Sequence, residues 1–435
     1  MDPILAGILS VLVMLALMAL GVHIATVLAG CAIAGLLLTS GWQITGSLIA
    51  NSLYSGVSDY SLVLIPLYII MGSIAANSGI VEDSMKFAHK WLGGFRGSLA
   101  MTTILSCAFF AAVCGSSSAT AVAIGKFMIP EMKRYGYSDA LATGAVASAG
   151  TLGILIPPSL VMVVFCVMTD TPVGLLFISG IVPGILLTIL FMIGIRIAVH
   201  FDPSAAPAPV RASWGEKLGS IRHIWGVAIL IGVIWGGIYG GWFTATEAGA
   251  IGALLAILLM LFRHSLASTW SKLVESLPEA VQATGMIFIT MIAATLFSKY
   301  LTVLGVFDGI LQSMTSSSLH PFVTVILIYA IITIMGMFMV AMAVLLITAP
   351  LATAILVSLG YDPLWVGIIM ILLFELANIT PPIGLNTFVV KGIAPDVPIS
   401  EIFRGSFVFM VMIVVLIALL TVFPQIVLWL PNTLR

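Results

Sequence analysis

The sequence is poor in charge. Lys and Arg together number 16 and Asp and Glu 17, so charged residues make up 8% of the 435 residues, against roughly 25% in a soluble domain. Hydrophobic residues make up 61%. A water-soluble protein of this length could not cover its surface with so few charged side chains, so the composition predicts an integral membrane protein.

Other classes of protein are excluded by residues that are missing. The four cysteines lie in apolar stretches without a CxxC pair, which indicates neither a zinc site nor a disulfide framework. No basic run offers a phosphate-binding face, so nucleic acid is not an expected partner. An intramembrane enzyme needs a paired nucleophile and base or a metal cluster, and only scattered serines, one deep glutamate and isolated histidines are present. We therefore expect no enzyme, no organic cofactor and no transition-metal site.

Long apolar runs dominate instead. A helix needs roughly 20 apolar residues to cross the hydrocarbon core. Such runs lie near 4–20, 23–40, 60–77, 139–168 and 174–199 in the first half, and near 223–240, 244–262, 278–304, 363–391 and 403–430 in the second. The semi-polar stretches 42–57 and 265–277 are predicted to be interfacial amphipathic helices. The polar segment 201–222 is predicted to be a cytoplasmic linker between the halves.

Two further apolar regions, 98–131 and 320–359, are interrupted near their middles. The first breaks at Gly115–Ser118, and each arm has only about 15 residues, short for a full crossing. The second turns within Met335–Ala341. Both regions are therefore predicted to be re-entrant helical hairpins, which enter and leave the membrane on one side.

The distribution of basic residues tests this layout. With both hairpins re-entrant and the N-terminus on one side, only Lys299 and Arg435 fall on that side, and Lys126 lies inside the first hairpin. The other side carries Lys86, Lys90, Arg96, Lys133, Arg134, Arg196, Arg211, Lys217, Arg222, Arg263, Lys272, Lys391 and Arg404. The positive-inside rule makes the basic side cytoplasmic. Ten spans, two hairpins and periplasmic termini are therefore predicted, in the bacterial inner membrane.

The two halves share spaced markers. Tyr137 precedes Pro157 and Tyr361 precedes Pro381 by 20 residues in both cases, and each of these prolines is followed by another. Five spans per half is an odd number, so the second half must run inverted relative to the first. The sequence thus predicts two inverted repeats, 1–200 and 223–435, with broken helices at 139–168 and 363–391. Paired breaks in inverted repeats are typical of secondary transporters.

The breaks are the expected location of the chemistry, because unpaired backbone survives in a membrane only inside protein or beside a cavity. The first hairpin tip offers the hydroxyls of residues 116–118 and 120, and two consecutive prolines free the carbonyls that precede them. Half-helix carboxyl ends and free carbonyls suit a sodium ion, and half-helix amino ends suit a carboxylate. A proline kink packed against neighbouring helices is the alternative.

Three isolated charges carry more than one interpretation. Glu247 is expected to cap the start of a helix. Glu375 lies three residues before Asn378, and an intramembrane acid has either a structural hydrogen-bond role or a role in ion or proton coupling. Lys126, one hairpin arm away from the serines, either attracts an anionic substrate or extends to the cytoplasmic surface.

The motifs at these positions resemble the large membrane subunit of tripartite ATP-independent periplasmic (TRAP) transporters, and the resemblance covers nearly the whole chain. They are Leu64-Ile65-Pro66-Leu67, Gly115-Ser116-Ser117-Ser118-Ala119-Thr120-Ala121, Ile129-Pro130-Glu131-Met132, Thr151-Leu152-Gly153-Ile154-Leu155-Ile156-Pro157-Pro158-Ser159, Thr244-Ala245-Thr246-Glu247-Ala248 and Ile379-Thr380-Pro381-Pro382-Ile383-Gly384-Leu385-Asn386.

The resemblance implies an all-α elevator-type transporter, in which the hairpins and broken helices move against a scaffold. It implies sodium-coupled uptake of a small organic anion of the C4-dicarboxylate or sialic acid class. It also implies two partners, a periplasmic substrate-binding protein and a small four-helix membrane subunit. No four-helix segment precedes residue 1, so the small subunit is expected as a separate chain.

The resemblance also assigns residues. One ion site is expected at Ser116, Ser117, Gly150, Thr151 and Gly153, and its inverted counterpart at Gly336, Asn378, Thr380 and Pro381. Substrate contacts are expected from Ser118, Thr120, Pro157, Pro158, Asn386 and Thr387. Many members of the family carry an acid after the second hairpin's Gly-x-Phe, where this chain has Val340 and Ala341, so the identity of the substrate stays open.

Two rival functions remain. A self-sufficient sodium- or proton-coupled anion transporter of similar fold would need no binding protein, and a neighbouring gene for a secreted binding protein would distinguish it. An ion channel would need a continuous pore, which does not explain two opposed hairpins.

Overall fold

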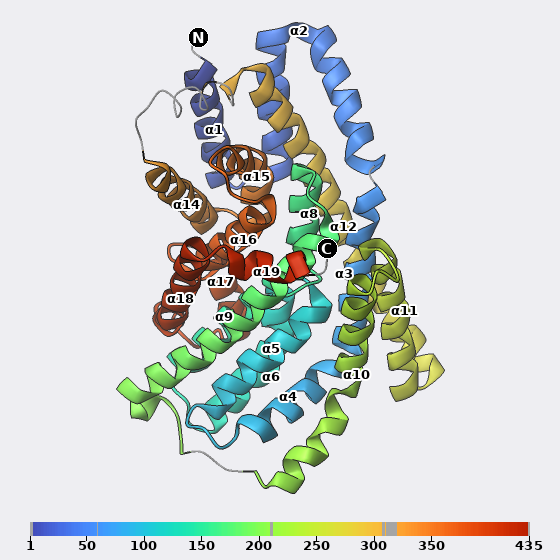
Figure 1. Cartoon of the computed structure of the whole chain (residues 1–435), viewed down its shortest axis with the longest axis vertical. Coiled ribbons are helices and arrows are strands. Elements are labelled where there is room, and N and C mark those ends of the chain that lie inside the picture. Colours follow the sequence, from blue (N-terminus) through green and yellow to red (C-terminus); the bar gives the residue numbers. More distant parts are fainter. Residues whose placement is uncertain (1–2, 59, 209–211, 307–308, 310–319, 434–435) are drawn as a thin grey trace.

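The computed structural model describes residues 3–58, 60–208, 212–306, 309 and 320–433, and in these ranges the chain is all-helical (Figure 1). The helices up to residue 205 are α1 (Pro3–Ala19), α2 (Ile24–Ser58), η1 (Tyr60–Val63), α3 (Leu64–Asn77), α4 (Ile80–Leu92), α5 (Ser98–Cys114), α6 (Ser117–Arg134), α7 (Asp139–Leu155), α8 (Leu160–Thr169), α9 (Val173–Phe201) and η2 (Pro203–Ala205). Those that follow are α10 (Trp214–Tyr239), α11 (Ala245–Arg263), α12 (Leu266–Val303), α14 (Pro321–Phe338), α15 (Ala341–Ser358), α16 (Pro363–Ile379), α17 (Leu385–Ile393), α18 (Ile399–Val422) and α19 (Gln425–Thr433).

Nine helical segments in the described ranges are long and apolar enough to cross a membrane, or ten if the bent pair α7–α8 counts as one span. The prediction of a multi-span membrane protein is confirmed. Helices α14 and α15, of 18 residues each, are among the nine, whereas α5 has 17 residues and falls just short. Length alone therefore does not separate a re-entrant hairpin from two crossings in the second half.

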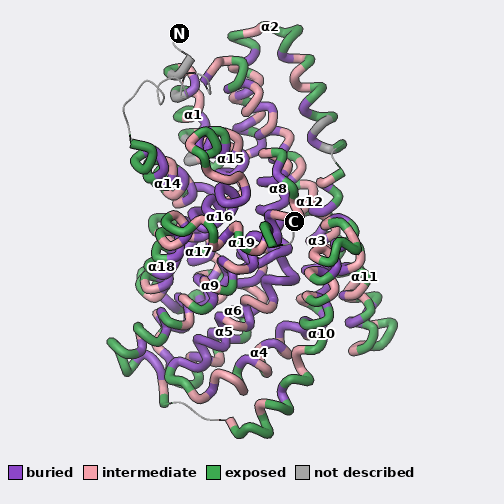
Figure 2. Tube along the Cα trace, in the orientation of Figure 1, coloured by how far each residue is buried: buried purple, intermediate pink, exposed green. Residues whose placement is uncertain are grey.

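Two helices form the centre of the molecule. All residues of α7 from Leu141 to Leu155 are buried, and so are nearly all residues of α16. The two helices contact each other, and the purple tube in the middle of Figure 2 marks the buried centre. Within α16 the fully buried Trp365 donates its indole N–H to the Leu420 carbonyl over 2.8 Å, so even this core helix has its polar group satisfied.

Several boundaries differ from the predictions. The stretch 42–57 is the second arm of α2 and is divided from the run before it by the non-helical Gly41 (φ 73°), as predicted, whereas the stretch 265–277 is continuous with the run after it in the 38-residue α12. The run 403–430 is interrupted, because α18 ends at Val422 and α19 begins after Pro424. Helix α4 was not predicted at all.

The linker 201–222 is also shorter than predicted. It contains η2, and α10 already begins at Trp214. Ser213 and Glu216 form a capping box there, each side chain bonding the other's backbone N–H, which stabilises this early start. Arg211 and Arg435, counted in the charge bias, lie outside the described residues.

Candidate functional site

Four helical segments are interrupted, each within the stretch where a break was predicted. The interruptions are Gly115–Ser116 between α5 and α6, residues 156–159 between α7 and α8, Met339–Val340 between α14 and α15, and residues 380–384 between α16 and α17. The α7–α8 pair bends by 42°. The two Pro-Pro pairs, 157–158 and 381–382, lie in the second and fourth interruptions.

The tip of the first hairpin lies directly on the α7–α8 break. Gly115 adopts φ 67°, and a Cβ there would lie 2.8 Å from the Pro158 carbonyl oxygen. The Gly115 carbonyl in turn accepts from Leu160 N–H over 3.4 Å. Ser116 caps α6 by accepting from the Ala119 N–H. Only glycine fits at position 115, because both the left-handed backbone and the close approach exclude a side chain.

Two glycines bring α6 against α7. A Cβ on Gly153 would lie 2.4 Å from the Ser116 carbonyl oxygen, and one on Gly150 would lie 2.7 Å from the Ala121 Cβ. The Ser116 carbonyl already accepts from the Thr120 hydroxyl over 2.7 Å. These predicted ion-site residues are therefore neighbours in space, and the glycines permit backbone contact between the two helices.

Asn386 connects the break after α16 to the tip of the first hairpin. Its amide nitrogen donates to the Ser117 hydroxyl over 2.7 Å and to the Ala147 carbonyl over 3.2 Å. One turn along α7, the Thr151 hydroxyl donates to the Ser148 carbonyl over 2.6 Å. We call Ser117, Ala147, Ser148, Thr151 and Asn386 the Asn386 cluster.

The Asn386 cluster contains unsatisfied oxygens. Asn386 Oδ1 and Ser148 Oγ are buried without a hydrogen-bond partner in the described chain. Leaving a buried polar atom without a partner costs about 1–3 kcal/mol. Because oxygen atoms are the ligands that hard cations prefer, the cluster is chemically suited to hold a cation.

The predicted counterpart residues lie around the end of α16. A Cβ on Gly336 would lie 2.6 Å from the Cβ of Ala377, so the second hairpin reaches the residue before Asn378. Asn378 is buried, and the Thr380 hydroxyl donates to the Leu376 carbonyl one turn earlier. Pro381 lies within the interruption that runs from Thr380 to Gly384. The counterpart residues are thus adjacent to one another, but no side-chain bond among them is recorded in the described residues.

Glu375 is the most isolated acid in the described chain. It is 0% exposed, and neither carboxylate oxygen has a hydrogen-bond partner there. The described residues therefore provide no partner for the structural hydrogen bond that was one of the two interpretations of Glu375. An ionised carboxylate in this position needs a cation or a proton for compensation.

A cavity of about 770 Å³ opens beside the first hairpin. Ser116, Ser118 and the exposed Lys126 line it from α6 or the residue before α6, and His264 and Lys272 line it from the α11–α12 region. Lys126 makes no ion pair or hydrogen bond with the described residues. The cavity is therefore polar on two sides, and its lining contains the unpaired Lys126 and also the Glu82 carboxylate from α4.

Of the six residues predicted to contact substrate, Ser118 alone lines this cavity in the described chain. Thr120, Asn386 and Thr387 are fully buried, and the Thr387 hydroxyl donates to the Gly384 carbonyl in its own turn. The Pro157 carbonyl accepts from the Trp235 indole over 3.0 Å. The Pro158 carbonyl faces Gly115. None of these five residues lines the cavity, and Thr120, Pro158 and Asn386 contact the tip of the hairpin instead.

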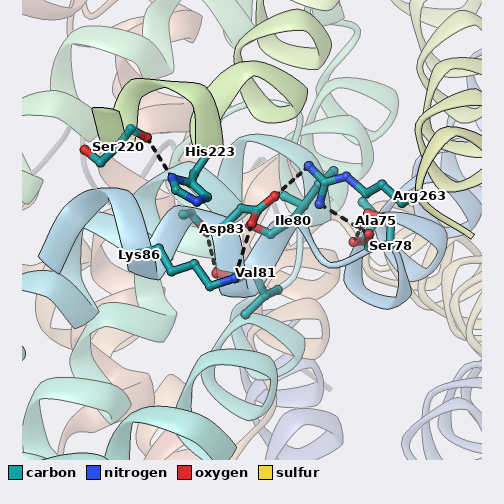
Figure 3. A network of polar contacts seen from close by, with 10 residues as sticks. Ala75, Ser78, Ile80, Val81, Asp83, Lys86, Ser220, His223 and Arg263 are labelled. Carbon is teal, nitrogen blue, oxygen red and sulfur yellow. Dashed lines mark hydrogen bonds and ion pairs between the residues drawn. The ribbon is translucent and has the colours of Figure 1, made fainter. Parts of the chain in front are cut away.

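Basic residues beside the cavity form bonds that the sequence analysis did not predict. Lys272 Nζ donates to the Asn77 carbonyl over 2.9 Å and lies 3.0 Å from His264 Nε2. Arg263 bonds Asp83 over 2.6 Å and the Ser78 carbonyl over 3.4 Å, as Figure 3 shows. These bonds hold the corner between α3 and α4, where Gly79 adopts φ 87°. Arg263 and Lys272 belonged to the predicted charge bias, but nothing in the sequence indicated their partners.

Glu247 has the role expected of it. Thr244 and Glu247 form a capping box at the start of α11, with the carboxylate accepting from the Thr244 N–H over 2.7 Å. The prediction of a helix-capping role is confirmed.

Interrupted helices packed around buried polar groups, beside a cavity in a multi-span helical protein, are the architecture of a membrane transporter. The fold agrees with this class. It is similar to the crystal structure of the Alcanivorax borkumensis YdaH transporter, with a TM-score of 0.66, 15% identity and coverage of 98% of this chain and 100% of that one.

Sequence comparison identifies the family. The profile described as "Tripartite ATP-independent periplasmic transporter, DctM component" matches residues 11–426. The chain is 37% identical to the C4-dicarboxylate TRAP transporter large permease protein DctM of Pseudomonas aeruginosa, over 89% of this chain and 90% of that one. It is 30% identical to the ectoine TRAP transporter large permease protein TeaC of Halomonas elongata, over 96% and 97%. The protein belongs to the DctM family and is the large permease of a TRAP transporter, a transport protein and not an enzyme.

Proposed function

We propose that this permease takes up a small organic anion by coupling its entry to a sodium gradient. The cavity beside the first hairpin carries the proposal, because it places the free cation Lys126 within the same wall as Ser116 and Ser118. A carboxylate substrate would be attracted by Lys126 and would meet the hydroxyls at the amino end of α6, where the helix dipole also favours a negative charge.

The Asn386 cluster is the proposed first sodium site. Its unpartnered oxygens are Asn386 Oδ1 and Ser148 Oγ, and the Asn386 amide bonds Ser117 at the hairpin tip. The residues that would frame the site are Ser116, Ser117, Gly150, Thr151 and Gly153. The counterpart site is proposed at Gly336, Asn378, Thr380 and Pro381, with Glu375 one turn before the end of α16. A sodium ion there would compensate the Glu375 charge.

An elevator motion in two inverted repeats is the proposed mechanism. Residues 1–200 and 223–435 would be the repeats, with both termini in the periplasm. The proposal is supported by the bias of basic residues and by the two matched hairpin-and-break pairs. The moving part would contain both hairpins and both broken helices, which contact one another through Ser117, Asn386, Gly336 and Ala377.

Two partners are part of the proposal: a periplasmic binding protein that delivers the substrate and a small membrane subunit as a separate chain. The family's description as tripartite supports both. A related permease is called "DctMQ" and is matched by this chain over only 54% of its own length. Such a length leaves room for a small subunit fused to the large one.

The test is uptake into proteoliposomes that contain this chain, the small subunit and the cognate binding protein. Uptake of the substrate that the binding protein selects should disappear when the sodium gradient is removed, and Lys126→Gln should raise the substrate concentration needed for half-maximal uptake. Uptake driven by protons alone would contradict the sodium assignment. Full uptake without the binding protein would favour a self-sufficient transporter.

Glu375→Gln separates ion coupling from substrate binding. The variant should raise the sodium concentration needed for half-maximal uptake and leave the binding protein's own substrate affinity unchanged. Glu247→Gln is the matched control, because that carboxylate is already used in a capping box. Equal sodium dependence in both variants would exclude Glu375 from the ion site.

A further inference from the structure

A second cavity, of about 500 Å³, lies away from the transport site. Leu92 and Phe95 line it from the end of α4 and the following turn, Met101 from α5, and Ile193, Arg196 and His200 from α9. It is therefore a groove between the α4–α5 connection and the last turns of α9, and it shares no lining residue with the cavity beside the first hairpin.

The groove is fixed by the backbone of its own walls. Gly97 adopts φ 82°, and a Cβ there would lie 2.9 Å from the Cγ2 of Ile195, so the turn after α4 packs directly on α9. Just beyond the turn, the Leu99 N–H donates to the Tyr137 hydroxyl over 3.0 Å. A groove held by such close contacts is preformed, which lowers the entropic cost of binding a flexible ligand.

The long wall of the groove is aliphatic. Ile189, Ile193 and Ile197 follow one another at four-residue spacing, so they form a stripe along one face of α9. They are 48%, 45% and 38% exposed, and Phe95 across the groove is 49% exposed. Such a surface is suited to a hydrocarbon chain that lies along the helix.

The end of the groove is cationic. Arg196 and His200 are exposed, lie one helical turn apart and sit in the last turns of α9, before the chain leaves the helix at Asp202. The Arg196 guanidinium stacks over the Phe95 ring at 5.8 Å and has no acidic partner within 4 Å in the described chain. Asp202, the nearest acid along the chain, accepts instead from the Ser204 N–H and hydroxyl.

Two other exposed arginines, at positions 134 and 404, differ in this respect, whereas the exposed Arg96 and Arg222 also have no acidic partner within 4 Å in the described chain but do not line this groove. Arg134 has Glu131 at 3.9 Å, and Arg404 has Glu401 at 3.6 Å. Arg196 thus combines an apolar groove with a charge that no neighbouring side chain neutralises. A ligand that satisfies both features has a hydrocarbon chain and an anionic head.

The geometry points to a binding site for a phospholipid with an anionic headgroup. One acyl chain lies along Ile189, Ile193 and Ile197, and the phosphate lies at Arg196 and His200. Basic pockets at the membrane surface of helical proteins recognise anionic headgroups in this way. The site is separate from the proposed transport site: Met101, at the start of α5, is its one lining residue that belongs to the first hairpin, and no lining residue belongs to the hairpin tip or to the breaks.

Native mass spectrometry of the purified permease tests the site. The protein is incubated with equal amounts of phosphatidylglycerol and phosphatidylcholine that carry the same acyl chains. The wild type should retain phosphatidylglycerol preferentially. Arg196→Gln should lower that retention about fivefold, as expected for the loss of one basic group near a membrane surface. Arg196→Lys should keep most of it, because the charge remains.

Arg134→Gln is the matched control, since it removes a surface arginine that lines no groove. Glycerol phosphate, a headgroup without chains, should not displace the lipid, because the aliphatic wall contributes to binding. Equal retention of both lipids by the wild type, or equal loss in Arg196→Gln and Arg134→Gln, would overturn the assignment. The unfolding temperature of each variant is measured in parallel, and Arg196 is exposed, so its replacement leaves no buried gap.

Discussion

The Asn386 side chain donates to the Ser117 hydroxyl over 2.7 Å, although the two residues are 269 positions apart. One residue follows the Pro-Pro break after α16, and the other stands at the tip of the first hairpin. The bond therefore connects the interrupted segments of the two halves, and it does so at a buried position, where a lost bond leaves an unsatisfied group.

A double-mutant cycle measures this connection. Ser117→Ala and Asn386→Ala should each lower the free energy of unfolding, and the double variant should lose about 1 kcal/mol less than the sum, because the second substitution removes a bond already broken. Thermal unfolding in detergent provides the measurement. Ser117→Ala combined with Thr348→Val, whose hydroxyl bonds its own helix, should be additive. Additivity in both pairs would mean that the Asn386 bond contributes nothing.

Gly153→Ala should destabilise the protein. The new methyl group would lie 2.4 Å from the Ser116 carbonyl oxygen, a backbone atom that cannot move without shifting α6. A cost of about 1–3 kcal/mol is expected for such overpacking. Gly232→Ala is the control, because nothing lies within 4 Å of its Cβ position in α10, and the gain in helix propensity should be neutral or slightly stabilising. Equal unfolding temperatures for the two variants would contradict the close packing of α6 on α7.

The ion pair at the corner of α3 and α4 should be more important for stability than surface pairs. The Arg263 and Asp83 side chains are 18% and 16% exposed and lie 2.6 Å apart. Arg263→Met leaves the Asp83 charge partly buried and should cost about 3 kcal/mol, whereas Arg404→Met should cost less than about 1 kcal/mol, since its partner is exposed. Adding Asp83→Asn to Arg263→Met should recover part of the loss. An equal effect at positions 263 and 404 would show that burial does not strengthen the pair.

Asp396 forms a pH-dependent ion pair with Lys133, which connects the loop before α18 to α6. The hydrogen bond from Lys133, at 2.5 Å, lowers the pKa of the Asp396 carboxyl below its ordinary value. A lowered pKa means that the contribution to stability is complete above about pH 4, the ordinary range of Asp, and is lost as the pH falls through the lower value. Asp396→Asn should therefore flatten the acid side of the profile of unfolding temperature against pH. A profile unchanged by the substitution would show that the Lys133–Asp396 ion pair does not contribute to stability.

The breaks could be located from the sequence because their signals are local. Gly115 and Ser116 end one helix and cap the next, and the two Pro-Pro pairs remove backbone donors wherever they occur. The helix α4 was missed because residues 80–92 carry both charged and apolar side chains, which matches neither a span nor a loop. The stretch 265–277 was separated wrongly from the run 278–304, because Pro278 lies inside α12 without ending the helix.

The cavity could not have been predicted in the same way. Its walls come from α3, α4, α6 and the α11–α12 region, and whether Lys126 faces Lys272 or lipid depends on how those helices pack. Five of the predicted substrate residues lie outside this cavity, and their role stays a prediction. Their polar groups bond other parts of the chain, as Asn386 does with Ser117 and Pro157 with Trp235, and such packing contacts cannot be read from the sequence.

The length of α12 determines what surrounds the cavity. Its 38 residues extend for about 57 Å at 1.5 Å per residue, and even a tilt of about 40° leaves roughly 44 Å along the membrane normal, well beyond a hydrocarbon layer of about 30 Å. One end of α12 must therefore extend beyond the hydrocarbon layer. The polar first turns of α12, which include Lys272, are that end. Because Lys272 also lines the cavity beside the first hairpin, we expect that cavity to open toward water.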